Sequence, residues 1–212
     1  MQTISIEDAC AIEGETIFVD ANIFIFVDGL ISFDKRQQEY SDAYFKIIKN
    51  NTLITSEHCI SEFYNRSVKH YFQLDLEEDP KLKFKTHRKS ESFQSTLVAM
   101  SDATSRFMEE VEICEITKDK SSVLKALEWA TTGCIDFVDA IVSNYCIKNN
   151  LFMLTDDSDC FHCPNLRIIT NNSWMLKNKD NRAKNWFDVR KKLFEPVFTS
   201  MFIVCSGFGI FF

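Results

Sequence analysis

Short apolar runs alternate with segments of helical periodicity along the first 170 residues of the chain. Strands are predicted where β-branched and apolar residues run together, at 16–19, 53–55, 151–154 and 166–169. Helices are predicted where apolar residues recur at helical spacing, from 21, at 35–49, from the N-cap Ser56, and at 92–108, 123–129 and 136–147. This alternation predicts an α/β fold, a three-layer sandwich whose central parallel sheet has four to five short strands flanked by helices.

Two regions depart from this pattern. Residues from about 75 to 91 are polar and charged, which predicts a loop or an exposed helix start. Residues 179–212 follow the last predicted strand, with an amphipathic helix at 186–193 and an uncharged tail at 197–212. The tail is shorter than the roughly 20 residues of a membrane span. A buried strand pair or helix is favoured for it over a partner-binding surface, and a membrane anchor is favoured least.

The composition limits the function classes. A formal net charge of −7 argues against a protein that coats nucleic acid through bulk positive charge. It does not exclude a nuclease, because bound metal ions offset a carboxylate cluster locally. The first fifteen residues lack a basic region followed by an apolar run, so we expect reduced thiols and a cytoplasmic location. Cys160 and Cys163 have the spacing of half a zinc site, and no second such pair occurs.

Acidic residues gather where a parallel sheet binds ligands, just beyond strand ends or near the starts of helices. These residues are Asp20, Glu62, Asp136, Asp139, Asp156, Asp157 and Asp159. Carboxylates brought together repel one another, so such a group implies a compensating cation. Ligands that are all oxygen suit Mg²⁺ or Mn²⁺. Taken singly, each acid is more often a helix cap or a solvated loop charge; the ordered set favours a metal site.

The same residues resemble the motifs of a known family. Residues 19–25, VDANIFI, resemble the opening strand and turn of PIN domains, with an Asp followed by an Asn two residues on. Ser61-Glu62-Phe63 resembles the second acidic position of that family. Residues 139–142, DAIV, and 149–159, NNLFMLTDDSD, are similar to its third and fourth motifs. The resemblance covers about 15–175, so we expect a PIN-like nuclease domain over 1–178, with a helical insertion at about 70–120 and a C-terminal extension over 179–212.

The resemblance implies a divalent-metal-dependent endoribonuclease that hydrolyses RNA with Mg²⁺ or Mn²⁺ as cofactor. The catalytic and metal-binding residues it implies are Asp20, Glu62, Asp139 and Asp157, with Asp159 as a supplementary metal ligand. Supporting roles behind these ligands are expected for Asn22, Asp136, Thr155 and Asp156. Two assignments have competitors, since Asp136 lies three residues before Asp139 and Glu57 begins the helix that carries Glu62.

Basic residues offer candidate contacts to the RNA backbone. Residues 81–89, KLKFKTHRK, carry five formal positive charges, on Lys81, Lys83, Lys85, Arg88 and Lys89, around Phe84, which could stack on a base. An ordinary solvated charged loop explains the same segment equally well. Arg66 and Lys69, which follow Glu62 on the same predicted helix, are further candidates for phosphate contacts.

Several functions and partners fit the resemblance. The ribonuclease is expected to have RNA as its substrate, and it could be the toxin of a toxin–antitoxin pair, with an antitoxin protein as partner and a homodimeric state. No membrane association is expected. The alternatives are a non-catalytic PIN-like module that binds RNA or protein, and a DNA-directed nuclease with the same metal chemistry. Every expected acidic position is filled, which favours an enzyme.

Overall fold

A parallel sheet forms the centre of the molecule. The computed structural model describes residues 2–28, 34–116 and 119–181. Within them six strands pair in the order β1-β6-β5-β2-β3-β4, and every neighbouring pair is parallel. The strands are β1 (Gln2–Ser5), β2 (Thr16–Val19), β3 (Thr52–Ser56), β4 (Glu112–Cys114), β5 (Phe152–Leu154) and β6 (Arg167–Thr170). The predicted fold class is confirmed, and the described sheet is wider than the four to five strands expected.

The two strands that the apolar pattern does not reveal, β1 and β4, lie at the edges of the sheet. Thr3 is the one buried residue of β1, and no residue of β4 is buried. An edge strand covered on one side needs no continuous apolar run, so hydrophobic periodicity does not distinguish it from a loop.

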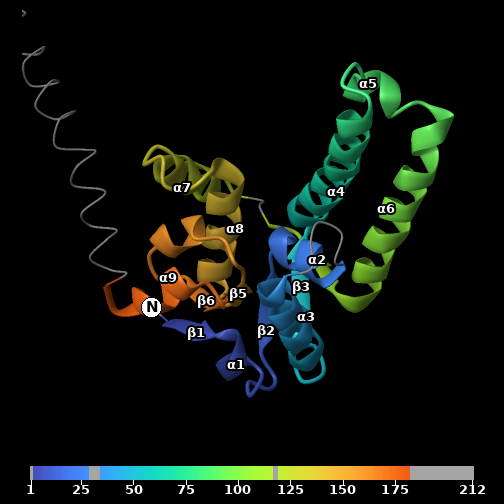
Figure 1. Ribbon diagram of the computed structural model, residues 1–212. Coiled ribbons are helices and arrows are strands. Elements are labelled where there is room, and N and C mark those ends of the chain that lie inside the picture. Colours follow the sequence, from blue (N-terminus) through green and yellow to red (C-terminus); the bar gives the residue numbers. More distant parts are fainter. Residues whose placement is uncertain (1, 29–33, 117–118, 182–212) are drawn as a thin grey trace, which may run out of the picture.

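Helices cover both faces of the sheet. The described helices are α1 (Ile6–Ala9), α2 (Ala21–Asp28), α3 (Lys35–Ile47), α4 (Glu57–Glu78), α5 (Phe84–His87), α6 (Glu91–Glu110), α7 (Lys120–Ala130), α8 (Phe137–Lys148) and α9 (Ser173–Lys177), with 3-10 turns η1 (Asp159–His162) and η2 (Lys179–Asn181). Figure 1 shows α1, α2 and α3 on one side of the sheet and α7, α8 and α9 on the other.

Alternation along the strands produces these two layers. Ile17 and Val19 of β2 pack in one apolar cluster with residues of α1, α2 and α3, whereas Phe18 between them packs in a second cluster with residues of α7 and α8. Successive strand side chains point to opposite faces, so a continuous apolar run indicates a strand buried on both sides. The central strands are short and apolar for this reason.

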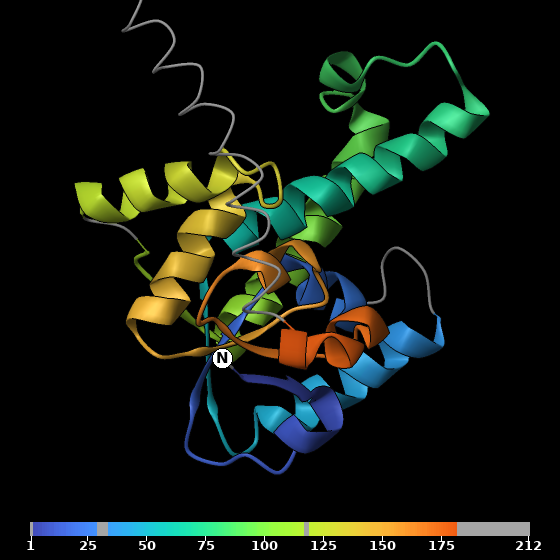
Figure 2. The ribbon, with the colours of Figure 1, turned by 90° about the vertical axis from the view of Figure 1, so that its left-hand side faces the viewer.

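A long helical hairpin projects from the sheet. Ser56 caps α4 as predicted, since its hydroxyl accepts the backbone N–H of Cys59 at 3.3 Å. Helices α4 and α6 lie side by side and carry α5 at their tip (Figures 1 and 2). The hairpin has its own apolar cluster, which includes Phe72 of α4 and Phe93 of α6, with Leu76 packed against it. The charged residues from about 75 were predicted to form a loop or an exposed helix start. The apolar packing explains why α4 continues through them to Glu78.

The predicted helix at 186–193 and the uncharged tail at 197–212 lie outside the described residues. Within the described residues, no helix is long and apolar enough to cross a membrane.

Three phenylalanine rings join the hairpin to the helical layer beside the sheet. Phe63 of α4 is fully buried, with its ring centroid 6.2 Å from that of Phe24 and 5.2 Å from that of Phe107. We expect Phe63→Ala to lower the free energy of unfolding by about 3–5 kcal/mol, because it leaves a cavity between α2, α4 and α6. Urea denaturation measures this, with Phe45→Ala as control, since Phe45 is 46% exposed and should cost less than about 1 kcal/mol. Equal losses for the two variants would contradict this packing.

Candidate active site at the carboxyl edge of the sheet

Asp20 lies at the centre of the candidate site, directly after β2. Its backbone N–H donates to the carbonyl of Leu154 at 3.1 Å, which continues the pairing of β2 with β5. The side chain is buried: Oδ1 accepts the N–H of Ala21 at 2.7 Å, and Oδ2 accepts Nδ2 of Asn22 and the hydroxyl of Thr155, each at 2.6 Å. The carboxylate is therefore held in one orientation by groups from both strand ends.

Three further acids approach Asp20 from separate elements. Glu62 comes from α4, Asp139 from the first turn of α8, and Asp157 from the loop after β5. Burial raises the pKa of Asp20 to about 6, against hydrogen bonds from Thr155 and Ala21 that lower it, and the charges of Glu62 and Asp157 raise it further. The charges of Glu62 and Asp157 therefore reach the carboxyl group of Asp20.

The pKa of Asp139 is raised further than that of Asp20. Burial is the main cause that raises its pKa to about 8, followed by the charges of Asp20, Asp136, Asp157 and Glu62. Like charges that share a site without a cation favour the protonated form.

The donor chemistry of these side chains fits a hard divalent cation, because every donor is a carboxylate oxygen. In the described part of the chain, however, no three His, Cys, Asp or Glu side chains converge closely enough to hold a metal ion. Glu62 is engaged by Arg66, whose Nη1 lies 3.0 Å from its Oε1. The described side chains therefore supply donors of a suitable type without forming a closed group of three.

Asp136 and Asp159 flank the four acids and have local structural roles. The carboxylate of Asp136 caps α8, accepting the N–H of Asp139 at 2.9 Å. The N–H of Asp159 donates to Oδ1 of Asp157 at 2.9 Å, which fixes the loop that follows β5. Burial, followed by the charge of Asp157, raises the pKa of Asp159. The charge of Asp157 thus reaches Asp159, whereas Asp136 caps α8.

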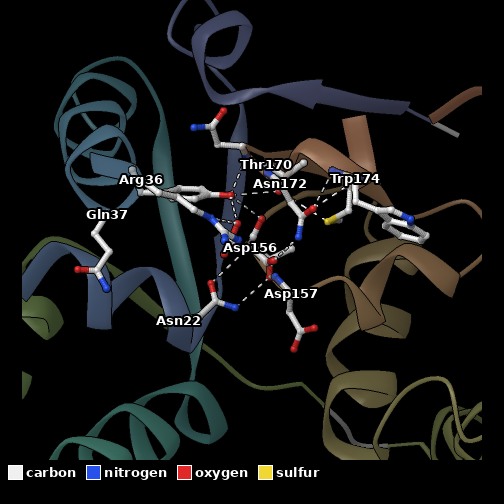
Figure 3. Close-up of polar contacts among 12 residues, drawn as sticks. Asn22, Arg36, Gln37, Asp156, Asp157, Thr170, Asn172 and Trp174 are labelled. Atoms are coloured by element: carbon white, nitrogen blue, oxygen red, sulfur yellow. Dashed lines mark hydrogen bonds and ion pairs between the residues drawn. The ribbon is translucent and has the colours of Figure 1, made fainter. Parts of the chain in front are cut away.

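The side chain of Asp156 points toward Arg36 of α3, away from its neighbour Asp157 (Figure 3). Its Oδ1 accepts Nε of Arg36 at 3.1 Å and the hydroxyl of Tyr40 at 2.7 Å, and its Oδ2 pairs with Nη2 of Arg36. Its backbone connects to the site, since its N–H donates to Oδ1 of Asn22 at 3.2 Å. Asp156 therefore anchors the strand end, while its neighbour Asp157 belongs to the acidic cluster.

Sequence reasoning missed three residues of this site. Arg36 and Tyr40 lie more than a hundred residues from Asp156 in the chain, and no motif links them to it. Cys59 is buried with its Sγ 4.0 Å from Oδ1 of Asp20, and burial, followed by the charge of Asp20, raises its pKa to about 12. Its position three residues before Glu62 on the same helix was the one available signal.

The predicted RNA-binding residues lie at two levels of the hairpin. Arg66 and Lys69 are exposed on α4, one and two turns beyond Glu62. The exposed cations Lys81, Lys83, Lys85, Arg88 and Lys89 surround α5 at the tip (Figure 1). The ring centroid of Phe84 lies 5.1 Å from that of Phe72, and Phe84 is half-buried. Its ring therefore packs within the hairpin.

Comparisons with known proteins add little to this geometry. No protein-family model matches the sequence, and no curated protein is detectably similar to it. Among solved structures, VapBC2 from Rickettsia felis, bound to a DNA fragment from its promoter, has a TM-score of 0.48 and 16% identity over 73% of this chain and 98% of that chain. PAE2754 from Pyrobaculum aerophilum has a TM-score of 0.44 and 12% identity over 79% of this chain and 90% of that chain. Both scores lie below 0.5, so these likenesses carry no argument about function.

The raised carboxyl pKa values predict that the protein without metal loses stability as pH rises. Between the ordinary value of 3.8 and about 8, folded Asp139 holds a proton that the unfolded chain releases. The free energy of unfolding therefore falls across this window. We expect Asp139→Asn to raise the unfolding temperature in EDTA at about pH 8.5 and to flatten its decrease from about pH 5. Thermal denaturation at several pH values measures both effects.

The matched control for this pH prediction is Asp102→Asn, an exposed carboxylate on α6. It makes the same substitution at a carboxylate away from the site and should leave the pH dependence as in the wild type. If Asp139→Asn and Asp102→Asn have the same unfolding temperatures across the range, charge repulsion at the site does not limit stability.

The adjacent residues Asp156 and Asp157 are predicted to have opposite mutational effects. Asp156→Asn weakens the contacts to Arg36 and Tyr40 and should cost about 1–3 kcal/mol of unfolding free energy while Mn²⁺ affinity is retained. Asp157→Asn should change stability in EDTA little and weaken Mn²⁺ binding at least about tenfold. Urea denaturation and electron paramagnetic resonance of free Mn²⁺ measure the two quantities. The reverse pattern would exchange the roles of the two carboxylates.

Proposed function

We propose that the chain is a divalent-metal-dependent endoribonuclease of the PIN type. The observation that supports it best is that the charges of Glu62 and Asp157 raise the pKa values of both Asp20 and Asp139, beside the carboxyl edge of a parallel sheet. Ligand sites of open α/β sheets lie at this edge. Perturbed pKa values in such a group are typical of functional sites. The proposal also agrees with the order of the motifs that resemble PIN domains.

In this proposal Asp20, Glu62, Asp139 and Asp157 would hold Mg²⁺ or Mn²⁺, with Asp159 as a supplementary ligand. When bound, the cation supplies positive charge against the scissile phosphate and lowers the pKa of a water molecule. Asn22 and Thr155 orient the carboxylate of Asp20 through their hydrogen bonds to Oδ2. Arg66, paired with Glu62, is positioned to exchange that carboxylate for a phosphate oxygen of the RNA.

The basic tip provides a second contact for RNA in this proposal. Glu78 lies sixteen residues beyond Glu62 on α4, which is about 24 Å at 1.5 Å per residue. None of Lys81, Lys83, Lys85, Arg88 and Lys89 forms an ion pair with another described residue. An RNA that reaches both places contains at least about seven stacked nucleotides at about 3.4 Å each. Substrates longer than short oligonucleotides therefore fit best.

A second candidate function is a non-catalytic PIN-like module that binds RNA or protein. The observation that favours it is the lack of a closed metal-binding group among the described side chains. Every acidic position of the PIN resemblance is filled, which favours the enzyme over the binding module. An antitoxin partner, a homodimer and a cytoplasmic location belong to the ribonuclease proposal as expectations from the family resemblance.

Cleavage of labelled single-stranded RNA by the purified protein tests the enzyme. We expect cleavage with Mg²⁺ or Mn²⁺, none in EDTA, and losses of at least about a hundredfold in kcat for Asp20→Asn and Asp139→Asn. Asp102→Asn, which removes an exposed carboxylate of α6, should cleave like the wild type. Single-stranded DNA of the same sequence serves as the comparison substrate.

Each result that contradicts the ribonuclease proposal leads to a different conclusion. Preferential cutting of DNA would replace the ribonuclease by a DNA-directed nuclease with the same metal chemistry. RNA binding without cutting and without Mn²⁺ binding would leave the non-catalytic module. Cleavage that survives Asp20→Asn would place the active site elsewhere in the chain.

A further inference from the structure

A small hollow lies beside the acidic site, next to the loop that follows β5. Its volume is about 290 Å³, and it is lined by Ser158, His162, Asn172 and Trp174. This size is at the lower limit of small-molecule sites, which are about 300–1,000 Å³. The hollow therefore fits a single flat ring system better than a larger ligand.

Trp174 provides an aromatic surface to this hollow. It is 44% exposed, although large aromatic side chains are usually buried well beyond this. Its ring is held in place, with its centroid 5.0 Å from the ring of buried Phe161 and 6.3 Å from that of His162. Its backbone N–H donates to Oδ1 of Asn172 at 3.1 Å in the first turn of α9. An indole that is fixed and half-exposed is preorganised for stacking.

The sheet topology brings this surface to the acidic cluster. Ser158 follows Asp157 after β5, and Trp174 follows β6, the parallel neighbour of β5. Asn172 lies between the two loops, with Nδ2 donating to the carbonyl of Asp156 at 3.1 Å and Oδ1 accepting from Trp174 (Figure 3). The hollow and the carboxylates therefore occupy the same edge of the sheet.

We propose that this hollow is a nucleobase subsite, in which the base of a nucleotide next to the scissile phosphate stacks on Trp174. This inference rests on the proposed ribonuclease function. The carboxyl group of Asp159 lies close enough to His162 of the hollow for their charges to interact, and an uncharged planar base is tolerated beside that carboxyl group. Stacking on an aromatic face is open to every base, so the subsite positions the RNA without selecting a sequence.

RNA binding by the full chain in EDTA, on an Asp20→Asn background, tests the subsite without requiring cleavage. We expect Trp174→Leu to raise the Kd for a fluorescent single-stranded RNA by about five- to a hundredfold, and Trp174→Tyr to remain within about threefold of the parent. The matched control is Phe45→Leu on α3, because Phe45 is exposed to a similar extent, 46%. Fluorescence anisotropy measures all four proteins.

A direct probe is the indole N–H resonance of Trp174, assigned by its loss in Trp174→Tyr. We expect uncharged nucleosides to shift this resonance. A shift with an arginine amide and none with nucleosides would overturn the inference and make the hollow a cation site for a protein side chain.

The test separates this inference from the proposed function. If the wild type cleaves RNA while Trp174→Leu leaves both the Kd and the KM unchanged, the nucleobase subsite is wrong and the ribonuclease stands. If no RNA is cleaved but binding still depends on an aromatic side chain at 174, the ribonuclease is wrong and the stacking site stands.

Discussion

The parallel pairing of β2 with β5 is the constraint on which the candidate site depends. It places Asp20 and Thr155 at adjacent strand ends, although 135 residues separate them in the chain. The hydroxyl of Thr155 and the amide of Asn22 then hold one oxygen of a buried carboxylate. Without this register the acids would be separate loop charges, each free to turn to solvent.

Bringing carboxylates together has an energetic cost that the surrounding structure offsets. Hydrogen bonds from Thr155 and Ala21 stabilise the charged form of Asp20 against burial, whereas Asp139 lies where burial and neighbouring charges favour its proton. Around this cluster, the contacts of Asp156 with Arg36 and Tyr40 connect the loop after β5 to α3. The carboxylates that repel one another are thus carried by backbone segments that hydrogen bonds hold in place.

Helix α4 links the site to a more distant surface. It begins at the capped strand end of β3, contributes Glu62 within two turns, and continues along α6 to the cationic tip. The aromatic contacts of Phe63 with Phe24 and Phe107 hold its base against the sheet layer. One rigid element therefore sets both the position of an acidic side chain and the direction in which an extended ligand can lie.

The sequence by itself determined the elements buried on both sides of the sheet and the order of the acidic positions. Strand β5 is apolar throughout, and β2 is apolar from Ile17 to Val19, because both faces are covered. Asp20 and Asp157 follow these strands, whereas Glu62 and Asp139 lie near the starts of helices. Edge strands β1 and β4 gave no such signal, because little of their surface is buried. Only the tertiary structure paired Asp156 with Arg36 and Tyr40 and brought Trp174 to the same edge. These contacts join residues far apart in the chain, and the orientation of a side chain depends on neighbours that local periodicity does not encode.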